Sequence, residues 1–288
     1  MKSSRVEGPL GESGSLPAAA LWWTRQLLAV RPATTRDAVA LWSAVARATF
    51  VWGRERAVTG SFGQFLTRRI EVRPLGLRIE VQPHSDDLFY AMVGHKSALV
   101  RWFHPEAGEF VIDVGAHLGL YSLIASRSGA RVLALEPNPE TYASLQRQIQ
   151  LNSASVEPLE VAAGREAGTA PLYASTGSSG VSSLRPEWSS QYRVASEPPR
   201  QVQVVTLDAL GNERGWEAID WLLIDAEGSE ADILEGATRT LSQTRRVILE
   251  VAHGAIAERC ARMLEAQGFQ IVERSRQNDV NSYWLAVR

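Results

Sequence analysis

Short apolar runs alternate with amphipathic segments through the second half of the chain. The first run, FVIDV at Phe110–Val114, is typical of a strand buried on both faces. Helical spacing of apolar residues and further apolar runs then alternate. The predicted order is strand 110–114, helix 117–128, strand 131–135, helix 139–151, strand 159–162, strand 221–224, helix 230–241, strand 247–251 and helix 256–267. Such repetition predicts an α/β fold with a doubly wound, mostly parallel seven-stranded sheet and right-handed crossovers.

Additional strands are predicted at 170–174 and 201–205. The segment between them, 175–200, is rich in Ser, Gly and Pro, and a loop of that length is more often functional than idle. The last two predicted strands, 269–273 and 283–287, flank the turn-forming residues Arg276-Gln277-Asn278-Asp279. Strands joined by a short turn run antiparallel, so we expect one antiparallel strand at the edge of the sheet.

The first part of the chain lacks this alternation. Residues 1–17 are rich in Gly and Ser and predict a disordered tail. Residues 18–68 predict a helical extension, in which Pro32 separates two helices and Thr35 is the N-cap of the second. The tryptophans of this extension favour packing, and its apolar character makes a homodimer formed through these helices a possible assembly.

A short region connects the extension to the main domain. Residues 69–109 predict a β-hairpin that turns at Pro74-Leu75-Gly76, followed by a helix. Residues 110–288 then predict the main ligand-binding domain.

Composition narrows the classes of protein to consider. The 288 residues carry a net charge of -2, which gives no general attraction to nucleic acid, so no nucleic-acid partner is expected. The N-terminus lacks the apolar core of a signal peptide, and no apolar run reaches the roughly 20 residues of a membrane span. We therefore expect a cytoplasmic protein. Its two lysines, Lys2 and Lys96, against many arginines are typical of a GC-rich bacterial genome.

The chain has a single cysteine, Cys260. One cysteine excludes an intramolecular disulfide and a multi-cysteine zinc site. Because it lies in the amphipathic segment 256–267, a buried inert thiol is favoured over a nucleophile.

The most informative motif is Asp113-Val-Gly-Ala-His-Leu-Gly119, between a predicted strand and a predicted helix. Gly115 allows a tight turn and a close approach of a ligand to the backbone, and Gly119 allows close passage over the helix start. The G-x-x-x-G spacing differs from the G-x-G-x-x-G of dinucleotide binders. A ligand without pyrophosphate, such as S-adenosylmethionine, fits it better. Asp113 is placed to meet a positive charge or, through water, the methionyl amine.

A carboxylate follows at a suitable distance. Glu136 ends the next predicted strand, about 20 residues beyond the glycines, where doubly wound folds place an acid against ribose hydroxyls. Charge-assisted hydrogen bonds to two vicinal hydroxyls are roughly twice as strong as neutral ones. An acid that only stabilises a helix start is the alternative for Glu136 alone, but its register with the glycine turn favours ribose binding.

Four more polar residues follow two other predicted strands. Asp225 and Glu227 come after the strand 221–224, while Glu250 and His253 lie at the end of the strand 247–251. Each is a candidate general base or metal ligand. Capping of the following helix is the alternative for each residue separately.

Taken together, these motifs resemble the FkbM family of methyltransferases. The resemblance rests on FVIDVGAHLGLYSL, LALEPNPETYASLQRQIQLN, GSSGVSSL, VVTLDAL and LLIDAEGSEADILEGA, in that order; the upstream His84-Ser-Asp-Asp-Leu88 is also similar. It implies a Rossmann-like class I methyltransferase fold and S-adenosyl-L-methionine as cofactor. The implied reaction is O-methylation of a hydroxyl on a small molecule, such as a natural product, glycoside or surface sugar.

The resemblance also implies positions for the cofactor. The expected cofactor-binding residues are Asp113, Gly115, Ala116, His117, Gly119, Tyr121, Ser122, Glu136, Pro137, Asn138, Ala162 and Asp225. Among them, Asn138 and Ala162 are expected near the adenine. The family usually has Asn where this chain has His117, so the sequence departs from the family pattern at this contact.

Methyl transfer to an unactivated hydroxyl calls for a base. We expect His253 or Asp225 in this role, with Glu227 as a further catalytic candidate. A divalent metal held by Asp225, Glu227 and Glu250 is a minority hypothesis and is not expected. Of the other classes, nucleic-acid methyltransferases and nicotinamide oxidoreductases fit the motifs less well. A non-catalytic cofactor-binding scaffold or partner subunit is the alternative to an enzyme.

Overall fold

A computed structural model describes most of the chain from residue 98 onward and parts of what precedes it. The described residues are 28–43, 46, 68–82, 87, 90–91, 98–174, 182–186, 198–276 and 281–288. Several expectations therefore lie outside the described residues. They are the disordered tail, most of the helical extension and its homodimer, most of the segments 84–88 and 175–200, and the turn at 277–279.

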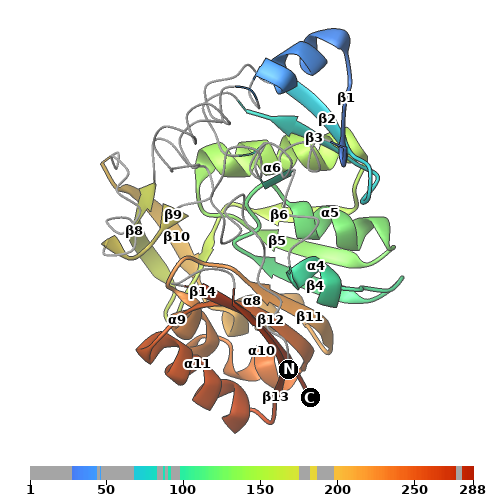
Figure 1. Ribbon diagram of the computed structural model, residues 1–288. Helices are drawn as coiled ribbons and strands as arrows, with labels where there is room; N and C mark the ends of the chain where they lie inside the picture. Colours follow the sequence, from blue (N-terminus) through green and yellow to red (C-terminus); the bar gives the residue numbers. More distant parts are fainter. Residues whose placement is uncertain are drawn as a thin grey trace, which may run out of the picture.

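The main sheet has seven strands in the order β13-β14-β12-β11-β4-β5-β6 (Figure 1). Their bounds are Phe110–Val114 (β4), Arg131–Leu135 (β5), Val156–Leu159 (β6), Ile219–Ile224 (β11), Thr244–Ala252 (β12), Gln270–Arg276 (β13) and Asn281–Val287 (β14). Strands β4, β5, β6, β11 and β12 are parallel. The predicted doubly wound, mostly parallel sheet is confirmed.

The position of the antiparallel strand differs from the expectation. Strand β14 is antiparallel to both of its neighbours, β12 and β13, and lies between them. The edge strand is β13, which runs in the parallel direction. The last hairpin thus folds its second strand inward, and Asn281, Tyr283, Trp284 and Ala286 of this strand are buried.

Helices cover both faces of this sheet, and alternate strand residues face different cores. Ile112 and Leu222 belong to the core with α8–α11, whereas Val111 and Leu223 belong to the core with α4 and α5. The helices are Ala98–Trp102 (α4), Leu120–Arg127 (α5), Pro139–Asn152 (α6), Leu207–Arg214 (α8), Glu230–Glu235 (α9), Thr238–Ser242 (α10) and Ala255–Ala266 (α11). Cys260 is buried on α11, where burial raises its pKa to about 12, as expected for an inert thiol.

Two predicted elements are divided in the structure. The expected helix 230–241 is broken between α9 and α10 at Gly236, where a side chain would come within 2.1 Å of the carbonyl oxygen of Gly164. The expected strand 159–162 is divided between β6 and β7, Ala162–Ala163. These two strands belong to different sheets. An apolar run alone cannot reveal such a change of partner.

A second sheet of four strands has the order β7-β10-β8-β9. It consists of β7 with Gly168–Ala174 (β8), Ser182–Ser183 (β9) and Arg200–Val205 (β10). This sheet places Leu172 and the described end of the long Ser- and Gly-rich segment beside the site described below.

A third sheet, β1-β2-β3, precedes the main domain. Its strands are Val30–Pro32 (β1), Arg68–Val72 (β2) and Leu77–Val81 (β3), and the last two form the expected hairpin. Pro32 was expected to separate two helices, but in the structure it ends strand β1. This strand lies at the edge of its sheet, where a residue without an N–H is tolerated. The following cap is also shifted by one residue: Thr34, not Thr35, accepts a hydrogen bond from the Asp37 amide.

The third sheet is fastened to α6 by two side-chain amides, which we call the amide clamp. Gln148 accepts from the backbone N–H of Glu80 at 2.9 Å and donates to its carbonyl at 2.7 Å. Asn152, one turn later, does the same with Arg78 at 2.9 and 2.7 Å. The clamp therefore satisfies the outer backbone groups of β3 as another strand would.

Among the described residues there is no helix with the length and apolar character that crossing a bilayer requires.

Candidate functional site

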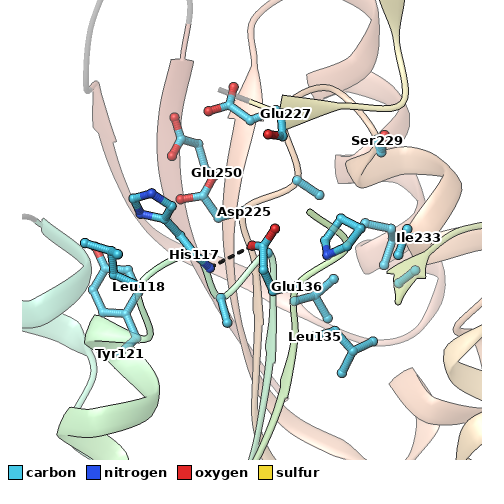
Figure 2. Close-up of a pocket in the computed structure, with 18 of the residues that line it drawn as sticks. His117, Leu118, Tyr121, Leu135, Glu136, Asp225, Glu227, Ser229, Ile233 and Glu250 are labelled. Atoms are coloured by element: carbon cyan, nitrogen blue, oxygen red, sulfur yellow. Dashed lines mark hydrogen bonds between the residues drawn. The ribbon is translucent and has the colours of Figure 1, made fainter. Parts of the chain in front are cut away.

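The main pocket lies at the carboxyl ends of β4, β5, β11 and β12, where ligands of open α/β sheets bind. Figure 2 shows the carboxyl groups of Asp225, Glu227 and Glu250 close together, with Glu136 below them in the view. Of the expected site residues, it is lined by Gly115, Ala116, His117, Tyr121, Glu136, Pro137, Ala162, Asp225, Glu227 and Glu250. The described lining contains no Lys or Arg.

The turn after β4 forms the floor of this pocket. The amides of Gly115 and Ala116 both donate to the carbonyl of Leu135, at 2.9 and 3.0 Å, which joins the ends of β4 and β5. Gly115 has a φ of 81°, and a side chain there would lie 1.8 Å from the carbonyl oxygen of Asp225. The tight turn was expected, but in the structure the close approach at Gly115 is made by the protein's own backbone.

The next residues of the turn also have left-handed backbone. Gly119 (φ 80°) is the N-cap of α5, and a Cβ there would come within 2.4 Å of Leu145. His117 has a φ of 52°, a conformation that Asn adopts more readily than most residues. Asn, the residue that the family usually has at this position, is therefore favoured by the backbone conformation as well as by its polar side chain. The His117 ring lines the pocket and meets the ring of Tyr90 edge-on at 5.1 Å.

Glu136 is oriented by the backbone on both sides. One carboxylate oxygen accepts from the His117 amide and the other from the Asn138 amide, each at 2.9 Å (Figure 2). Burial raises the pKa of this carboxyl, although both amide bonds favour its charged form. A carboxylate has about four acceptor sites, so two remain for a ligand.

Asp113 lies behind the pocket wall and does not line the pocket. Its carboxylate accepts a hydrogen bond from the Ser122 hydroxyl at 2.6 Å, and both side chains are buried. Burial raises the pKa of Asp113 to about 6. Asp113 and Ser122, both expected at the cofactor, thus lie outside the pocket lining, and their hydrogen bond ties α5 to β4.

Asn138 also has a local structural role. Its side chain caps α6 by accepting from the Glu140 amide at 3.0 Å, and it donates to Ser182 on β9 at 3.0 Å. Asn138 is not among the residues that line the pocket, whereas its neighbour Pro137 and the expected Ala162 are. Ser182 and Leu184 line it too, so the end of the GSSGVSSL segment reaches the pocket.

Asp225 follows β11 and Glu250 lies on the neighbouring strand β12, and their carboxyl groups lie close together in the pocket (Figure 2). Burial and the nearby acids Glu250 and Glu227 raise the pKa of Asp225 well above its ordinary value. Burial also raises the pKa of Glu250, which accepts from Asn281 at 2.7 Å and from the Tyr283 hydroxyl. We call Asp225 and Glu250 the carboxyl pair.

The loop after β11 adds two further polar groups. Glu227 has a φ of 47°, and its carbonyl accepts from the Ser183 hydroxyl at 2.6 Å. Glu230 is buried below the loop, where burial raises its pKa to about 7. Its carboxylate accepts a hydrogen bond from the backbone N–H of Gly228 at 2.8 Å. Ser229 lines the pocket between them.

The structure does not bring His253 to the pocket. His253 is exposed, and its ring hydrogen-bonds to Ser282 at 2.7 Å. Strand β12 ends at Ala252, and His253 lies in the turn that follows it. The expected role of His253 as a base is therefore not supported by its position. Among the described residues, no group of three or more His, Cys, Asp or Glu side chains is arranged to hold a metal ion, so the minority metal hypothesis for Asp225, Glu227 and Glu250 finds no support either.

Two residues that the sequence analysis missed complete the site. Asn281 and Tyr283 lie two positions apart on β14, so they share a face, and both line the pocket. In the register of β14, Tyr283 is paired with Glu250. Only a correct position for β14 in the sheet could have revealed them. The other missed lining residues are mostly apolar, with Ile79, Tyr90, Ala91, Leu172 and Ile233 among them.

The part of the chain that resembles known proteins includes these site residues. A family model described as the methyltransferase FkbM domain matches residues 113–271, which include Gly115, Glu136, Asp225 and Glu250. Methyltransferase sdnD of Sordaria araneosa is 31% identical over 193 residues, which cover 56% of this chain and 74% of that protein. The 31-O-demethyl-FK506 methyltransferase FkbM of Streptomyces tacrolimicus is 28% identical over 57% of this chain and 74% of its own length. Hexuronic acid methyltransferase AglP of Haloferax volcanii is 27% identical over 52% of this chain and 58% of that protein.

Solved structures with a similar arrangement are more distant in sequence. Fibrillarin of Aeropyrum pernix, in complex with S-adenosyl-L-methionine, has a TM-score of 0.39 at 13% identity and covers 63% of this chain and 67% of its own. The tRNA (uracil-54, C5)-methyltransferase of Pyrococcus abyssi has a TM-score of 0.44 at 13% identity, over 73% of this chain and 42% of its own.

Proposed function

Since this chain belongs to the FkbM family of methyltransferases, we propose that it transfers a methyl group from S-adenosylmethionine to a hydroxyl of a small molecule. One observation carries the proposal. The glycine turn after β4 and the carboxylate that ends β5 line the same pocket, and the hydrogen bond from the His117 amide to Glu136 joins them. These are the two parts of an adenosine-binding crevice in a doubly wound fold.

The residues present fit such a cofactor. Glu136 has acceptor capacity left after its two backbone bonds, as vicinal ribose hydroxyls require. Apolar side chains beside it, from Leu135, Pro137, Val161 and Ala162, suit a flat aromatic base. We assign the methionyl end to the turn at Gly115, Ala116 and His117.

The bound cofactor supplies a methyl group on a sulfonium, whose carbon–sulfur bond breaks with its electron pair left on sulfur. The protein must then hold an acceptor oxygen in line with that methyl carbon. Such positioning supplies up to roughly 7–11 kcal/mol of the lowering of the barrier. The residues available for the acceptor lie at the Asp225 side of the pocket, next to the turn.

The acceptor is proposed to be a natural product, glycoside or surface sugar. The names of the relatives from Streptomyces and Haloferax mention FK506 and hexuronic acid. Oxygen is the atom that the polar end of this pocket suits best, since carboxyl, amide and phenol groups gather there around Asp225, Asn281 and Tyr283.

Calorimetry with S-adenosylhomocysteine tests the cofactor site. We expect binding by the wild-type protein and about 10- to 100-fold weaker binding by Glu136→Gln, since hydrogen bonds to a charged group contribute about 1.5–3 kcal/mol. Glu140→Gln is the matched control, because Glu140 lies in the first turn of the helix that follows Glu136 and its side chain is 73% exposed. Equal affinity of all three proteins contradicts the assignment of Glu136.

A second measurement distinguishes an enzyme from a scaffold. The wild-type protein is incubated with methyl-labelled S-adenosylmethionine and a pool of hydroxylated metabolites, and labelled products are sought by mass spectrometry. Labelled ether products support O-methylation. Cofactor binding without any product from any pool favours the non-catalytic scaffold instead.

A further inference from the structure

The carboxyl pair is placed to share a proton. Asp225 follows one strand and Glu250 lies on the neighbouring parallel strand, both line the pocket, and their carboxyl groups lie close together (Figure 2). Like charges held close together in a buried site disfavour double ionisation. The arrangement therefore favours a pair with one proton and one negative charge.

The surroundings place the charge on Glu250. Its carboxylate accepts from the Asn281 amide at 2.7 Å and from the Tyr283 hydroxyl. Donors stabilise the charged form of the group to which they donate. Asp225 faces Glu250, Glu227 and Glu230, all of which favour its neutral form. The proton therefore stays on Asp225.

The pair also lies beside the turn assigned to the methionyl end. The backbone carbonyl of Asp225 lies where a side chain on Gly115 would be, so β11 ends directly against this turn. Both carboxyls line the pocket. An acceptor held in line with the donor at this turn would have its hydroxyl within reach of the pair.

We propose that the Asp225–Glu250 pair accepts the proton of the acceptor hydroxyl, and that Asn281 and Tyr283 are positioning residues that hold Glu250. This inference rests on the proposed function. As the acceptor oxygen bonds to the methyl carbon, its O–H bond breaks, the bonding electrons stay on oxygen and the proton passes to the pair. A carboxylate suffices as the base, because a hydroxyl becomes strongly acidic once its oxygen begins to bond to carbon.

Other titratable groups face the pair from each neighbouring element. They are Glu227 after β11, Glu230 at the start of α9, Tyr121 on α5, Tyr283 on β14 and His117 in the turn after β4. The acids among them disfavour a second negative charge on the pair. Removing one donor to Glu250 should therefore change how the pair titrates.

The shared proton can be measured without an acceptor. In protein labelled with ¹³C at Asp and Glu carboxyl carbons, NMR titration should show a carboxyl, distinct from that of Glu230, whose pKa lies well above the ordinary range of Asp. Its signal should disappear in Asp225→Asn and be altered in Glu250→Gln. If both carboxyls of the pair are ionised at pH 6, the inference is wrong, whatever the protein methylates.

The catalytic part is tested by pH profiles with an acceptor found in the labelled pool. Glu250→Gln should lower kcat by about 10²–10⁴-fold with little change in KM. Tyr283→Phe keeps the packing and removes one donor, so the acidic limb of kcat/KM should move to higher pH. Glu258→Gln, an exposed acid on α11, is the control and should behave like the wild type.

The outcomes separate the two proposals. An unchanged rate in Glu250→Gln, or an unmoved acidic limb in Tyr283→Phe, overturns the role of the pair while the methyltransferase assignment stands. Should Glu250→Gln fail to fold, the pH profile of Tyr283→Phe decides alone. If the wild-type protein binds S-adenosylhomocysteine but methylates nothing, the proposed function fails and the catalytic role fails with it, while NMR still decides the shared proton.

Discussion

Gly115 marks the point where two strands meet without room for a methyl group. Its backbone is left-handed, and a Cβ would overlap the carbonyl of Asp225 at 1.8 Å. The position therefore combines two constraints, conformational and steric. Both constraints arise from the fold itself and do not depend on a bound ligand.

Gly115→Ala should reduce the free energy of unfolding by about 2–4 kcal/mol, measured by urea denaturation. The matched control is Gly215→Ala, since Gly215 has a φ of 64° but nothing within 4 Å of the place that an added methyl group would take. The control should lose only about 1–2 kcal/mol, the cost of the left-handed backbone. Equal losses in both variants would mean that the clash with Asp225 relaxes freely.

At this scale the sequence predicted the residues at the glycine turn better than those at the Asp225 end of the pocket. Gly115 and Glu136 could be located because both follow strands whose ends were predicted correctly. His253 lies away from the pocket because β12 ends at Ala252 and His253 belongs to the following turn, which an apolar run does not reveal. Tyr283 was missed because its strand contacts Glu250 only through the inward position of β14.

The amide clamp is an interaction between elements. Gln148 is fully buried and makes two hydrogen bonds to the backbone of Glu80. Asn152 repeats the arrangement one turn later on Arg78. Because Ile79 lies between these residues and lines the pocket, the clamp holds part of the pocket wall.

Gln148→Ala should lower the free energy of unfolding by about 2–3 kcal/mol, because two hydrogen bonds are lost and backbone groups are left unsatisfied. Gln150→Ala, an exposed position on the same helix, should change it by less than about 0.5 kcal/mol. Hydrogen exchange supplies the local readout: the Glu80 amide should lose protection in the first variant only. Retained protection would show that the clamp does not hold β3.

Elements that are buried on both faces were the most predictable. Strands β4 and β5 have the bounds expected from their apolar runs, because both faces of each pack against helices. Strand β1 was not expected, since three residues are too few for a periodic pattern. The division at Gly236 depends on contact with Gly164, which is remote in the sequence.

Over the whole molecule, buried acids determine how stability varies with pH. Burial raises the pKa of Asp113 to about 6 and that of Glu230 to about 7. Both values exceed those of the unfolded chain, so the folded protein binds more protons at intermediate pH. Their contribution to stability is therefore complete below about pH 4 and is lost as the pH rises through 6 and 7.

We expect the free energy of unfolding to fall between pH 5.5 and pH 8, by about 1 kcal/mol from Asp113 and about 2 kcal/mol from Glu230. Urea denaturation across this range measures the slope. The double variant Asp113→Asn, Glu230→Gln should flatten it, since neither replacement titrates. Stability that increases from pH 5.5 to pH 8 would contradict the burial of these acids.

The inward position of β14 also affects the order in which the molecule can assemble. Strand β13 pairs with β14 and not with β12, so its place in the sheet depends on β14. Both strands can therefore take their native places only once β14 has paired with β12. Asn281 and Tyr283 come with β14, so the polar end of the pocket is complete only when this strand is in place.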